Sequence, residues 1–587
     1  MNVRWRLLSH DRDAIAALAH SAGVPVLVAQ LLLNRGVADG HSAREFLSAR
    51  RDALHDPSTM HGVAEAADRL VRAAREGRKI VIYGDYDVDG VCGTSILWAC
   101  LKLAGAKEVE YYIPHRVEEG YGVNGDALRY LAKERRASVV VTVDCGVGGV
   151  KEARLARELG LEYIVTDHHH IGEELPAADV VVHPRHPEGS YPFGDLCGAG
   201  VAFKLAWQVC KSFGDGKKAS PHLRDFLLRA INLVAMATIA DVVPLRGENR
   251  IFVRHGLRGI VGTDASVGLK ALLEVSNCLN KDKLSTGNVS FGLAPRINAA
   301  GRLERAMRAV ELLTTDDAEE ALEIARELDE CNGRRREVET TIVREAHAMI
   351  EAQGGLGERG AIVLGCKGWH AGVIGIVASR LVEAYHRPTV VVALGAEVGQ
   401  GSARTVGDFH LYNALAACAE GLTSFGGHAA AAGLKLVPDR FDAFAERFDH
   451  YCRGALSADH RVKSLRIDAE VTLGMLSMAV VHAIDTLEPF GSANPRPLLV
   501  AENVHVVGEP KVVGERHLKL RLGQGTDTFP AIAFGQAEKL KALKGGMRCA
   551  VAFEPSINEW QGRREVQLEV KDIQMRPEGD AADDRIA

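Results

Sequence analysis

Apolar runs and amphipathic stretches alternate from about residue 61 to residue 184. Predicted strands cover 80–87, 108–115, 138–146, 161–169 and 178–184, and predicted helices cover 61–79, 93–106, 125–137 and 149–160. Strands that alternate with helices of about 10 to 15 residues predict βαβ units and a mostly parallel sheet. Because crossover connections are right-handed, the strands end at one common edge, where open α/β sheets bind ligands.

The pattern beyond this region predicts further parts of an α/β multidomain fold. Residues before the sheet resemble short helices. A long charged stretch, which can be one helix or two, precedes a second α/β pattern that is followed by many short strands. The predicted parts are an N-terminal helical segment (1–54), a parallel-sheet domain (55–245), a helical connector (246–353), a second, smaller α/β domain (354–455), a C-terminal β-barrel (456–575) and a disordered acidic tail (576–587).

Composition is that of a large globular protein. The chain has 587 residues, which predicts about three or four domains, since single cores stop growing beyond about 250–300 residues. A net charge of -6 means that a nucleic-acid partner would have to bind a local basic surface. The 11 cysteines form no CxxC pair, which argues against a zinc ribbon or a disulfide framework. No apolar run predicts a membrane span or a signal segment, so we expect a cytoplasmic protein.

Acids and histidines follow four predicted strand ends. They are Asp85, Asp87 and Asp89 after the first, Asp144 after 139–143, Asp167 and His168–His170 after 163–166, and Asp241 after the apolar run 233–240. Any one of them alone is as typical of a turn or a helix cap. Together on one sheet edge they predict a metal site, since carboxylates and imidazoles bind Mn²⁺, Mg²⁺ and Zn²⁺. More than four ligands suit two metals about 3.5–4 Å apart that share a carboxylate.

Four short motifs carry a resemblance to a known family. In this order, "GDYDVDG" (84–90), "VDCG" (143–146), "TDHH" (166–169) and "ADVVPL" (240–245) resemble the motifs of the DHH phosphoesterase superfamily. Later segments are similar to the RecJ family of bacterial single-strand-specific exonucleases: "APRINAAGR" (294–302), "GWHAGVIGIVASRL" (368–381), "GSAR" (401–404), "SFGGHAAAAG" (424–433) and "LEPFGSANPRP" (487–497). The resemblance spans about residues 55–575 and implies DHH, DHHA1 and OB-fold-like domains at 55–245, 354–455 and 456–575.

The resemblance also implies roles for the acids and histidines. The implied metal ligands of two divalent ions, Mn²⁺ or Mg²⁺, are Asp85, Asp87, Asp89, Asp144, His168 and Asp241. Asp144 would bridge the ions, and the implied catalytic residues are Asp85, Asp144, His168 and His169. Asp167 and His169 would contact the metal ligands rather than the ions themselves, and a carboxylate in such a position can orient an imidazole. Tyr83 stands where small-substrate relatives often have histidine, and Asp85 can compensate for it.

A second set of residues is predicted to bind phosphate. Arginine offers a planar fork to phosphate, and Gly-rich segments let backbone N–H groups approach an anion, although such segments equally form tight turns. The resemblance favours the binding role for Arg116, Tyr121, Arg296, Asn298, Arg302, Ser402, Arg404, Gly426, Gly427 and His428. The last five lie in two Gly-rich segments that we expect to be loops.

The C-terminal part is predicted to bind single strands. Basic residues alternate along its strands, and aromatic side chains are available for stacking, although most such aromatics belong to cores. The basic residues are Lys511, Arg516, Lys519 and Arg521, and the aromatics are Phe529, Phe534, Phe553 and Trp560.

These features lead to one functional prediction and two alternatives. We predict a metal-dependent exonuclease that degrades single-stranded DNA from the 5′ end in recombination and repair. Its expected partners are single-stranded DNA, a single-strand-binding protein and a RecQ-type helicase, and we expect a monomer. A nano-RNase or cyclic-dinucleotide phosphodiesterase would share the first four motifs without needing the β-rich part. A non-catalytic DNA-binding scaffold would not need the intact acid and histidine set.

Overall fold

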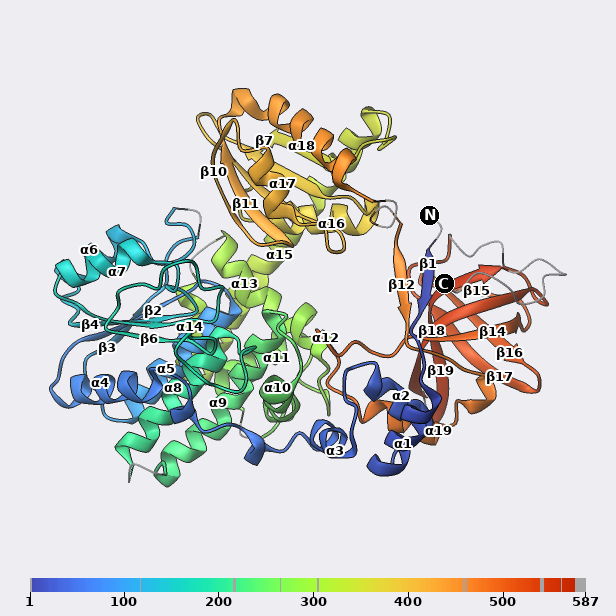
Figure 1. The fold of residues 1–587 in the computed structure, drawn as a ribbon, viewed down its shortest axis with the longest axis horizontal. Coiled ribbons are helices and arrows are strands. Elements are labelled where there is room, and N and C mark those ends of the chain that lie inside the picture. The colour runs from blue at the N-terminus through green and yellow to red at the C-terminus, as the bar shows by residue number, and fades with distance from the viewer. Residues whose placement is uncertain are drawn as a thin grey trace. The chain divides into compact units, whose positions relative to one another are not determined.

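The computed structural model describes residues 3–116, 118–214, 218–263, 265–303, 306–457, 460, 462–538, 543–560 and 562–575. The chain divides into two compact units (Figure 1). One unit comprises Met1–Arg50 with Val462–Ala587, and the other comprises Arg51–Arg461. The predicted disordered tail at 576–587 lies outside the described residues, and the predicted domain boundaries stay predictions.

The larger unit begins with the predicted parallel sheet. Its strands are β2 (Ile80–Gly84), β3 (Val109–Tyr112), β4 (Val139–Val143), β5 (Glu162–Thr166) and β6 (Val180–Val182), in the order β3-β2-β4-β5-β6, and every neighbouring pair is parallel. The intervening helices are α4 (Val63–Arg75), α5 (Val88–Leu103), α6 (Gly125–Lys133) and α7 (Val150–Glu158). Ile80 and Ile82 face one apolar core while Val81 and Tyr83 face another, because helices cover both sides of the sheet. The α/β fold class is confirmed.

Helices follow this sheet, and one of them corrects a prediction. They are α8 (Gly198–Phe213), α9 (Pro221–Ala240), α10 (Gly247–Ile260), α11 (Val267–Val275), α12 (Thr286–Asn288), a π-helical turn (Val289–Leu293), α13 (Ala294–Leu303), α14 (Met307–Thr314) and α15 (Ala318–Ala352). The run before Asp241 is the end of α9 and not a strand. Periodicity cannot separate a buried helix from a strand in a short apolar run, and α9 is buried against α5, α8 and α10.

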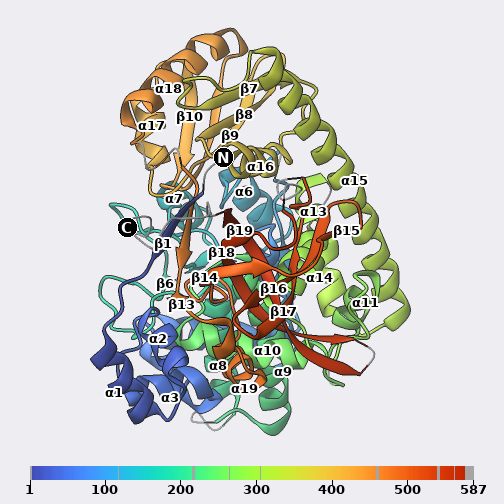
Figure 2. The ribbon, with the colours of Figure 1, turned by 90° about the vertical axis from the view of Figure 1, so that its right-hand side faces the viewer.

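Helix α15 connects the two α/β regions of the larger unit, and Figure 2 shows it along its length. Its first turns pack into the core beneath the parallel sheet, and its last turns pack into a separate core with helix α16 (Ile374–Tyr385). The prediction of one long helix or two is thereby resolved as one helix of 35 residues.

The second sheet has the order β10-β11-β9-β8-β7 and is mixed. Its strands are β7 (Ile362–Lys367), β8 (Thr389–Leu394), β9 (Gly399–Arg404), β10 (Leu422–Gly427) and β11 (Ala431–Leu436), with α17 (Leu411–Ala417) and α18 (Phe441–Ala455) beside them. The Gly-rich segments expected to be loops are strand β9 and the β10–β11 hairpin. Cross-strand pairing overrides the weak strand propensity of glycine there.

The smaller unit contains a closed ring of strands. β14 (Leu499–Val506), β18 (Arg548–Trp560), β19 (Arg563–Met575), β17 (Asp527–Ala533) and β16 (His517–Gln524) pair in sequence, and β16 pairs again with β14. β13 (Ala469–Glu470) and β15 (Lys511–Val513) flank the ring, and α19 (Met478–Asp485) packs on it. Five strands closed in this way form the barrel of an OB-fold.

The N-terminal segment shares the core of this barrel. Helices α1 (Arg12–Ala22), α2 (Val26–Leu33) and α3 (Gly40–Ser48) contribute apolar residues to it. The prediction of short helices alone missed strand β1 (Arg4–Leu7), which pairs in parallel with β12 (Ser464–Ile467), a partner too distant in sequence for local patterns to reveal. Among the described residues no single helix is long and apolar enough to cross a membrane, although the bent pair α1 and α2 together passes that test.

Candidate active site

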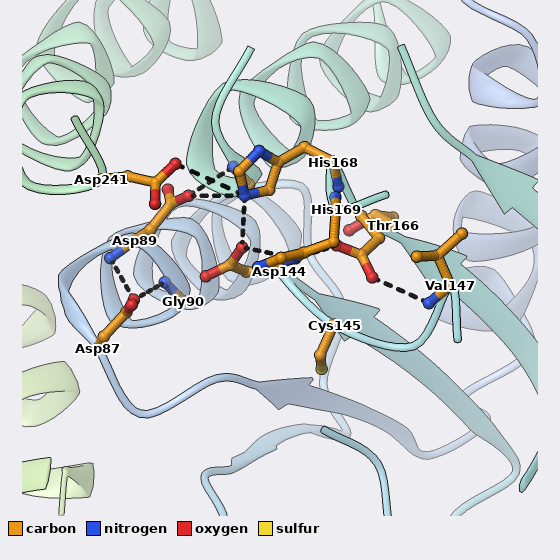
Figure 3. Close-up of polar contacts among 12 residues, drawn as sticks. Asp87, Asp89, Gly90, Asp144, Cys145, Val147, Thr166, His168, His169 and Asp241 are labelled. Atoms are coloured by element: carbon orange, nitrogen blue, oxygen red, sulfur yellow. Dashed lines mark hydrogen bonds and ion pairs between the residues drawn. The ribbon is translucent and has the colours of Figure 1, made fainter. Parts of the chain in front are cut away.

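The three aspartates after β2 occupy distinct positions at the start of α5. Asp87 caps the helix, and its Oδ1 accepts the N–H groups of Asp89 at 2.9 Å and Gly90 at 3.2 Å (Figure 3). Asp89 accepts the N–H groups of Gly198 at 2.6 Å and Ala199 at 2.7 Å, at the start of α8. Backbone N–H groups at helix N-termini favour negative charge, so both carboxylates are held in positions that suit an anion.

Three carboxylates converge on the His168 ring (Figure 3). Its Nε2 lies 3.1 Å from Asp144 Oδ1 and 3.6 Å from both Asp89 Oδ2 and Asp241 Oδ2. These side chains come from the ends of β4 and β5, from α5 and from the end of α9. Asp241 therefore reaches the predicted site although it follows a helix.

Asp144 is held in an unusual conformation. Its φ is +64°, a left-handed value that only aspartate, asparagine and glycine adopt at little cost. Gly198 packs directly on it, since a Cβ at that position would lie 2.5 Å from Asp144 Cβ. The side chain is buried and aimed at the other acids by this close approach of α8.

Asp167 and His169 form a bonded pair beside these acids. Asp167 Oδ1 lies 2.7 Å from His169 Nδ1, and Oδ2 accepts the Val147 N–H at 2.9 Å. The Tyr121 hydroxyl lies 3.1 Å from the His169 ring nitrogens. Burial lowers the pKa of His169, but the bond to Asp167 outweighs it and raises that pKa to about 9. Burial likewise raises the pKa of Asp167, and the bond to His169 brings it below its usual value.

The acids gathered at this edge of the sheet are electrostatically unfavourable on their own. Burial first, and then a neighbouring aspartate, raises the pKa of Asp85, Asp87 and Asp144 above the usual range, and raises that of Asp241 to about 8. Three buried atoms here have no hydrogen-bond partner in the described structure: Asp85 Oδ1, Asp144 Oδ1 and His168 Nε2. Unpaired buried acceptors around like charges fit a bound cation.

Atoms that could bind a metal form three groups in this region, and the atoms of each group lie within 4.8 Å of one another. The groups are Asp85 with Asp87 and Asp144, Asp89 with His168 and Asp241, and Asp144 with His168 and His169. We call Asp85, Asp87, Asp89, Asp144, His168 and Asp241 the acidic cluster. Asp144 belongs to two groups, which is the position that a bridging carboxylate needs. The donor set of oxygens with imidazole nitrogen suits Mn²⁺ or Mg²⁺.

Three of the predicted phosphate-binding arginines lie close enough for their charges to interact. Arg116 stacks over the Tyr86 ring at 4.8 Å, Arg302 donates to the Gly372 carbonyl at 3.0 Å, and Arg404 donates to Ser402 Oγ at 3.1 Å. Burial and then the charge of Arg116 lower the pKa of Arg302, to about 10, and that of Arg404. Like cations held together in this way suit a bound anion.

Other predicted binding residues have different surroundings. Asn298 Oδ1 accepts the Val88 N–H at 3.1 Å, so it supports the first turn of α5. Asn298 and Arg302 also line a cavity of about 460 Å³. Arg296 is not brought to the arginine group: it binds the carbonyls of Gly292 and Val275 and pairs with Asp329 at 2.8 Å.

The glycine hairpin is open to solvent. Gly426, Gly427 and His428 are exposed, and the His428 N–H donates to the Ala431 carbonyl at 2.8 Å. A Cβ at Gly426 would meet nothing within 4 Å, whereas Gly427 has a φ of +137° and a Cβ there would lie 2.5 Å from the Ala431 oxygen. The hairpin is thus open to solvent on the side where Gly426 lacks a side chain.

The structure adds residues that the sequence prediction missed. His183, directly after β6, has Nε2 2.8 Å from the His169 carbonyl, and the Arg185 N–H lies 3.0 Å from its Nδ1. A histidine at the end of a predicted strand was the available signal for it. Gly198 has no such signal, because its importance depends on a contact with Asp144 across more than fifty residues.

Some of the predicted strand-binding residues of the barrel are exposed and others are buried. Lys519 and Arg521 are exposed on one face of β16, and Lys511 pairs with Lys519 across the strands, while Arg516 is exposed in the turn between them. Phe534 is 51% exposed and contacts the His517 ring edge to face. Phe553 is fully buried and Phe529 packs on the core, so neither is free to stack, and the Trp560 side chain lies outside the described residues.

Comparisons with known proteins agree with this architecture. Family models match residues 79–231 (DHH family, N-terminal domain), 358–454 (DHHA1 domain) and 467–572 (RecJ OB domain). The single-stranded-DNA-specific exonuclease RecJ of Bacillus subtilis is 37% identical over 574 residues, which cover 97% of this chain and 70% of the relative.

Two solved structures are similar over almost the whole chain. RecJ of Thermus thermophilus in complex with Mn²⁺ is 33% identical with a TM-score of 0.82, over 98% of this chain and 80% of that one. The same protein in complex with Mg²⁺ is 32% identical with a TM-score of 0.77, over 98% and 79%. With three matching domains and relatives of this identity and coverage, the chain belongs to the RecJ family.

Proposed function

We propose that the protein is an exonuclease that hydrolyses single-stranded DNA from the 5′ end, in DNA recombination and repair. The observation that carries this proposal is the acidic cluster, with the unpaired atoms Asp85 Oδ1, Asp144 Oδ1 and His168 Nε2. The RecJ relatives carry the substrate class in their names. The reaction is hydrolysis of a phosphodiester bond by water.

The proposed cofactors are two divalent ions, Mn²⁺ or Mg²⁺, held by Asp85, Asp87, Asp89, Asp144, His168 and Asp241. Relatives solved with Mn²⁺ and with Mg²⁺ support this choice, as does the oxygen-rich donor set. When bound, such a pair activates a water molecule and neutralises charge on the reacting phosphate. The protein's own contribution is to hold the donors converged before the ions enter, through the helix N-termini at Asp89 and the left-handed backbone at Asp144.

His169 is proposed to act beside the acidic cluster. Asp167 fixes the orientation of its ring, and His183 holds its backbone carbonyl. With Nδ1 bonded to Asp167, its Nε2 is the atom that can donate to a phosphate oxygen, and the Tyr121 hydroxyl adds a second donor at the ring.

Arg116, Arg302 and Arg404 are proposed to hold the phosphate at or near the 5′ end, with Ser402 beside Arg404. Burial, and then the charge of Arg116, lower the pKa of Arg302 and of Arg404, and a bound anion would relieve this close positive charge. Phosphate capture by arginines of two different α/β regions would leave room for one strand only, which would account for selectivity for single strands without base recognition. The 5′ to 3′ direction rests on the resemblance to the family. The exposed basic residues of the barrel, Lys519 and Arg521, are proposed to bind the strand farther along.

A single-strand-binding protein and a RecQ-type helicase are the proposed partners, since a helicase produces single strands and a single-strand-binding protein holds them. A monomer in the cytoplasm is the proposed state.

Purified protein incubated with Mn²⁺ and DNA labelled at either end tests the proposal. Single strands should release mononucleotides from the 5′ end, while duplexes with blunt ends and samples with chelator should stay intact. Cleavage of dinucleotides alone would instead identify a nano-RNase or cyclic-dinucleotide phosphodiesterase. Binding of single strands without any cleavage would identify a scaffold.

A further inference from the structure

A second group of metal-binding side chains lies outside the acidic cluster. His61 precedes α4, and His186 and Glu188 lie in the loop after β6. One ligand atom from each residue lies within 4.8 Å of the others, and the two imidazole rings stack at 3.8 Å with an interplanar angle of 10°. Two imidazoles and a carboxylate differ in chemistry from the oxygen-rich acidic cluster.

The backbone of both segments is closely packed. A Cβ at Gly62 would lie 2.6 Å from the Val181 oxygen, and a Cβ at Gly189 would lie 3.1 Å from His61 Cβ. The close contacts at these two glycines therefore hold the loop after β6 against the start of α4. The two segments that carry the three residues are therefore packed together before an ion binds.

The three side chains make few hydrogen bonds that would oppose rotation. Among the described residues no hydrogen bond is made by the His61 ring or by the Glu188 carboxylate, and neither side chain is buried. The His186 ring accepts only the Glu188 N–H, at 3.2 Å. A metal lies in the plane of each imidazole that binds it, so the rings would leave their stack and exchange one weak hydrogen bond for coordination.

We propose that His61, His186 and Glu188 bind a transition-metal ion of the Zn²⁺ type, at a site separate from the acidic cluster. Two histidines and a glutamate form a known three-ligand set for Zn²⁺, with water in the fourth position. Affinity for nitrogen ligands is higher for Zn²⁺ than for Mn²⁺, so the two sites select different ions.

The loop that would bind this ion also supports the catalytic histidines. The His186 N–H donates to the His183 carbonyl at 3.1 Å, and His183 Nε2 lies 2.8 Å from the His169 carbonyl. An ion that ties His186 to His61 therefore restrains the loop that positions His169. Occupancy should slow local opening of residues 183–189 and of the segment around His169.

Zn²⁺ binding to the full chain in excess Mg²⁺, measured by competition with a chromophoric indicator, tests the proposal. His61→Ala and His186→Ala should each lose one equivalent of bound Zn²⁺ or bind it more weakly. Loss of a residue that only supports a metal ligand weakens metal binding by about 10-fold to 100-fold, so loss of a ligand should weaken it at least as much. Glu188→Gln keeps the side-chain size and should also weaken binding. His222→Ala, which changes an exposed histidine of the same unit, should bind as wild type does.

Hydrogen exchange provides a readout that does not depend on activity. Added Zn²⁺ should slow amide exchange at 183–189 in wild type and in His222→Ala, but not in His186→Ala. Equal Zn²⁺ stoichiometry and affinity in wild type and all four variants would overturn the proposal, since the ion would then bind at the acidic cluster only. The circular dichroism of each variant without Zn²⁺ verifies that it is folded.

Discussion

The two sheets of the larger unit differ in whether their polar groups are buried or exposed. The parallel sheet is buried on both faces, and it places Asp85, Asp89 and Asp144 almost entirely out of solvent. In the mixed sheet the hairpin strand β10 lies at the edge, and Gly426 and Gly427 are exposed on it. The parallel sheet therefore gathers buried charged side chains, whereas the edge of the mixed sheet exposes glycine residues to solvent.

This difference has an energetic consequence. Buried like charges raise one another's pKa and destabilise the folded chain unless a cation joins them. An exposed hairpin carries no such cost, because water satisfies its backbone groups. Substitutions in the parallel sheet should therefore affect stability and chemistry together, while those in the hairpin should affect substrate binding alone.

The largest effect is expected for Asp144→Asn. Asparagine tolerates the left-handed backbone at this position, so the fold should persist, while the loss of a charged ligand should lower kcat by at least about 10²–10³-fold, the range seen when one preorganised charge-stabilising group is removed. The measurement is release of mononucleotides from 5′-labelled single strands in Mn²⁺, with binding affinity measured in parallel. Turnover within about tenfold of wild type, a barrier change of about 1.4 kcal/mol, would contradict the bridging role.

Arg404→Ala should have the next largest effect. A charge-assisted hydrogen bond to phosphate is worth about 1.5–3 kcal/mol, which corresponds to about 10-fold to 100-fold in kcat/KM. Any preference for a 5′-phosphate over a 5′-hydroxyl should shrink as well. Arg453→Ala removes an exposed arginine that pairs with Asp449 in the same region and should leave both quantities unchanged. An unaltered end preference in Arg404→Ala would move the phosphate site elsewhere.

One substitution made in both regions compares them directly. In Gly198→Ala the new Cβ would lie 2.5 Å from Asp144 Cβ, so we expect overpacking to cost about 1–3 kcal/mol of unfolding free energy and to lower kcat. In Gly426→Ala the Cβ meets nothing within 4 Å, so stability should change by less than about 0.5 kcal/mol. Urea unfolding measures both variants. If the hairpin backbone binds substrate, Gly426→Ala should raise KM without lowering kcat.

The smallest effect is expected for Val242→Gly. Val242 follows Asp241, has a φ of +59° and is 67% exposed, so burial does not compensate for its strained backbone. Relief of about 1–2 kcal/mol of strain, less about 0.5–1 kcal/mol for the flexibility of glycine, should stabilise the chain by about 0.5–1 kcal/mol. A lower urea midpoint in this variant would show that the side chain contributes packing, and Val242→Asn provides a second test of the backbone argument.

Local patterns in the sequence were sufficient for the parallel sheet and for most of the acidic cluster. The strand periodicity predicted where β2, β4 and β5 end, and parallel strands end at a common edge, so Asp85, Asp144 and His168 had to converge. Asp241 was correctly assigned to the cluster from its motif, although its supposed strand is a helix. A capping aspartate such as Asp87 is also readable locally, because its hydrogen bonds reach only two and three residues ahead.

Contacts between distant segments were decided only by the tertiary structure. The sequence by itself determined the order of the elements, the α/β class and the identity of the acids. It could not show that Arg296 binds Asp329 and nearby carbonyls, that Gly198 packs on Asp144, or that β1 pairs with β12. The physical reason is that periodicity reports which face of an element is apolar, whereas a partner tens to hundreds of residues away is selected by shape and hydrogen bonding only once the elements have packed.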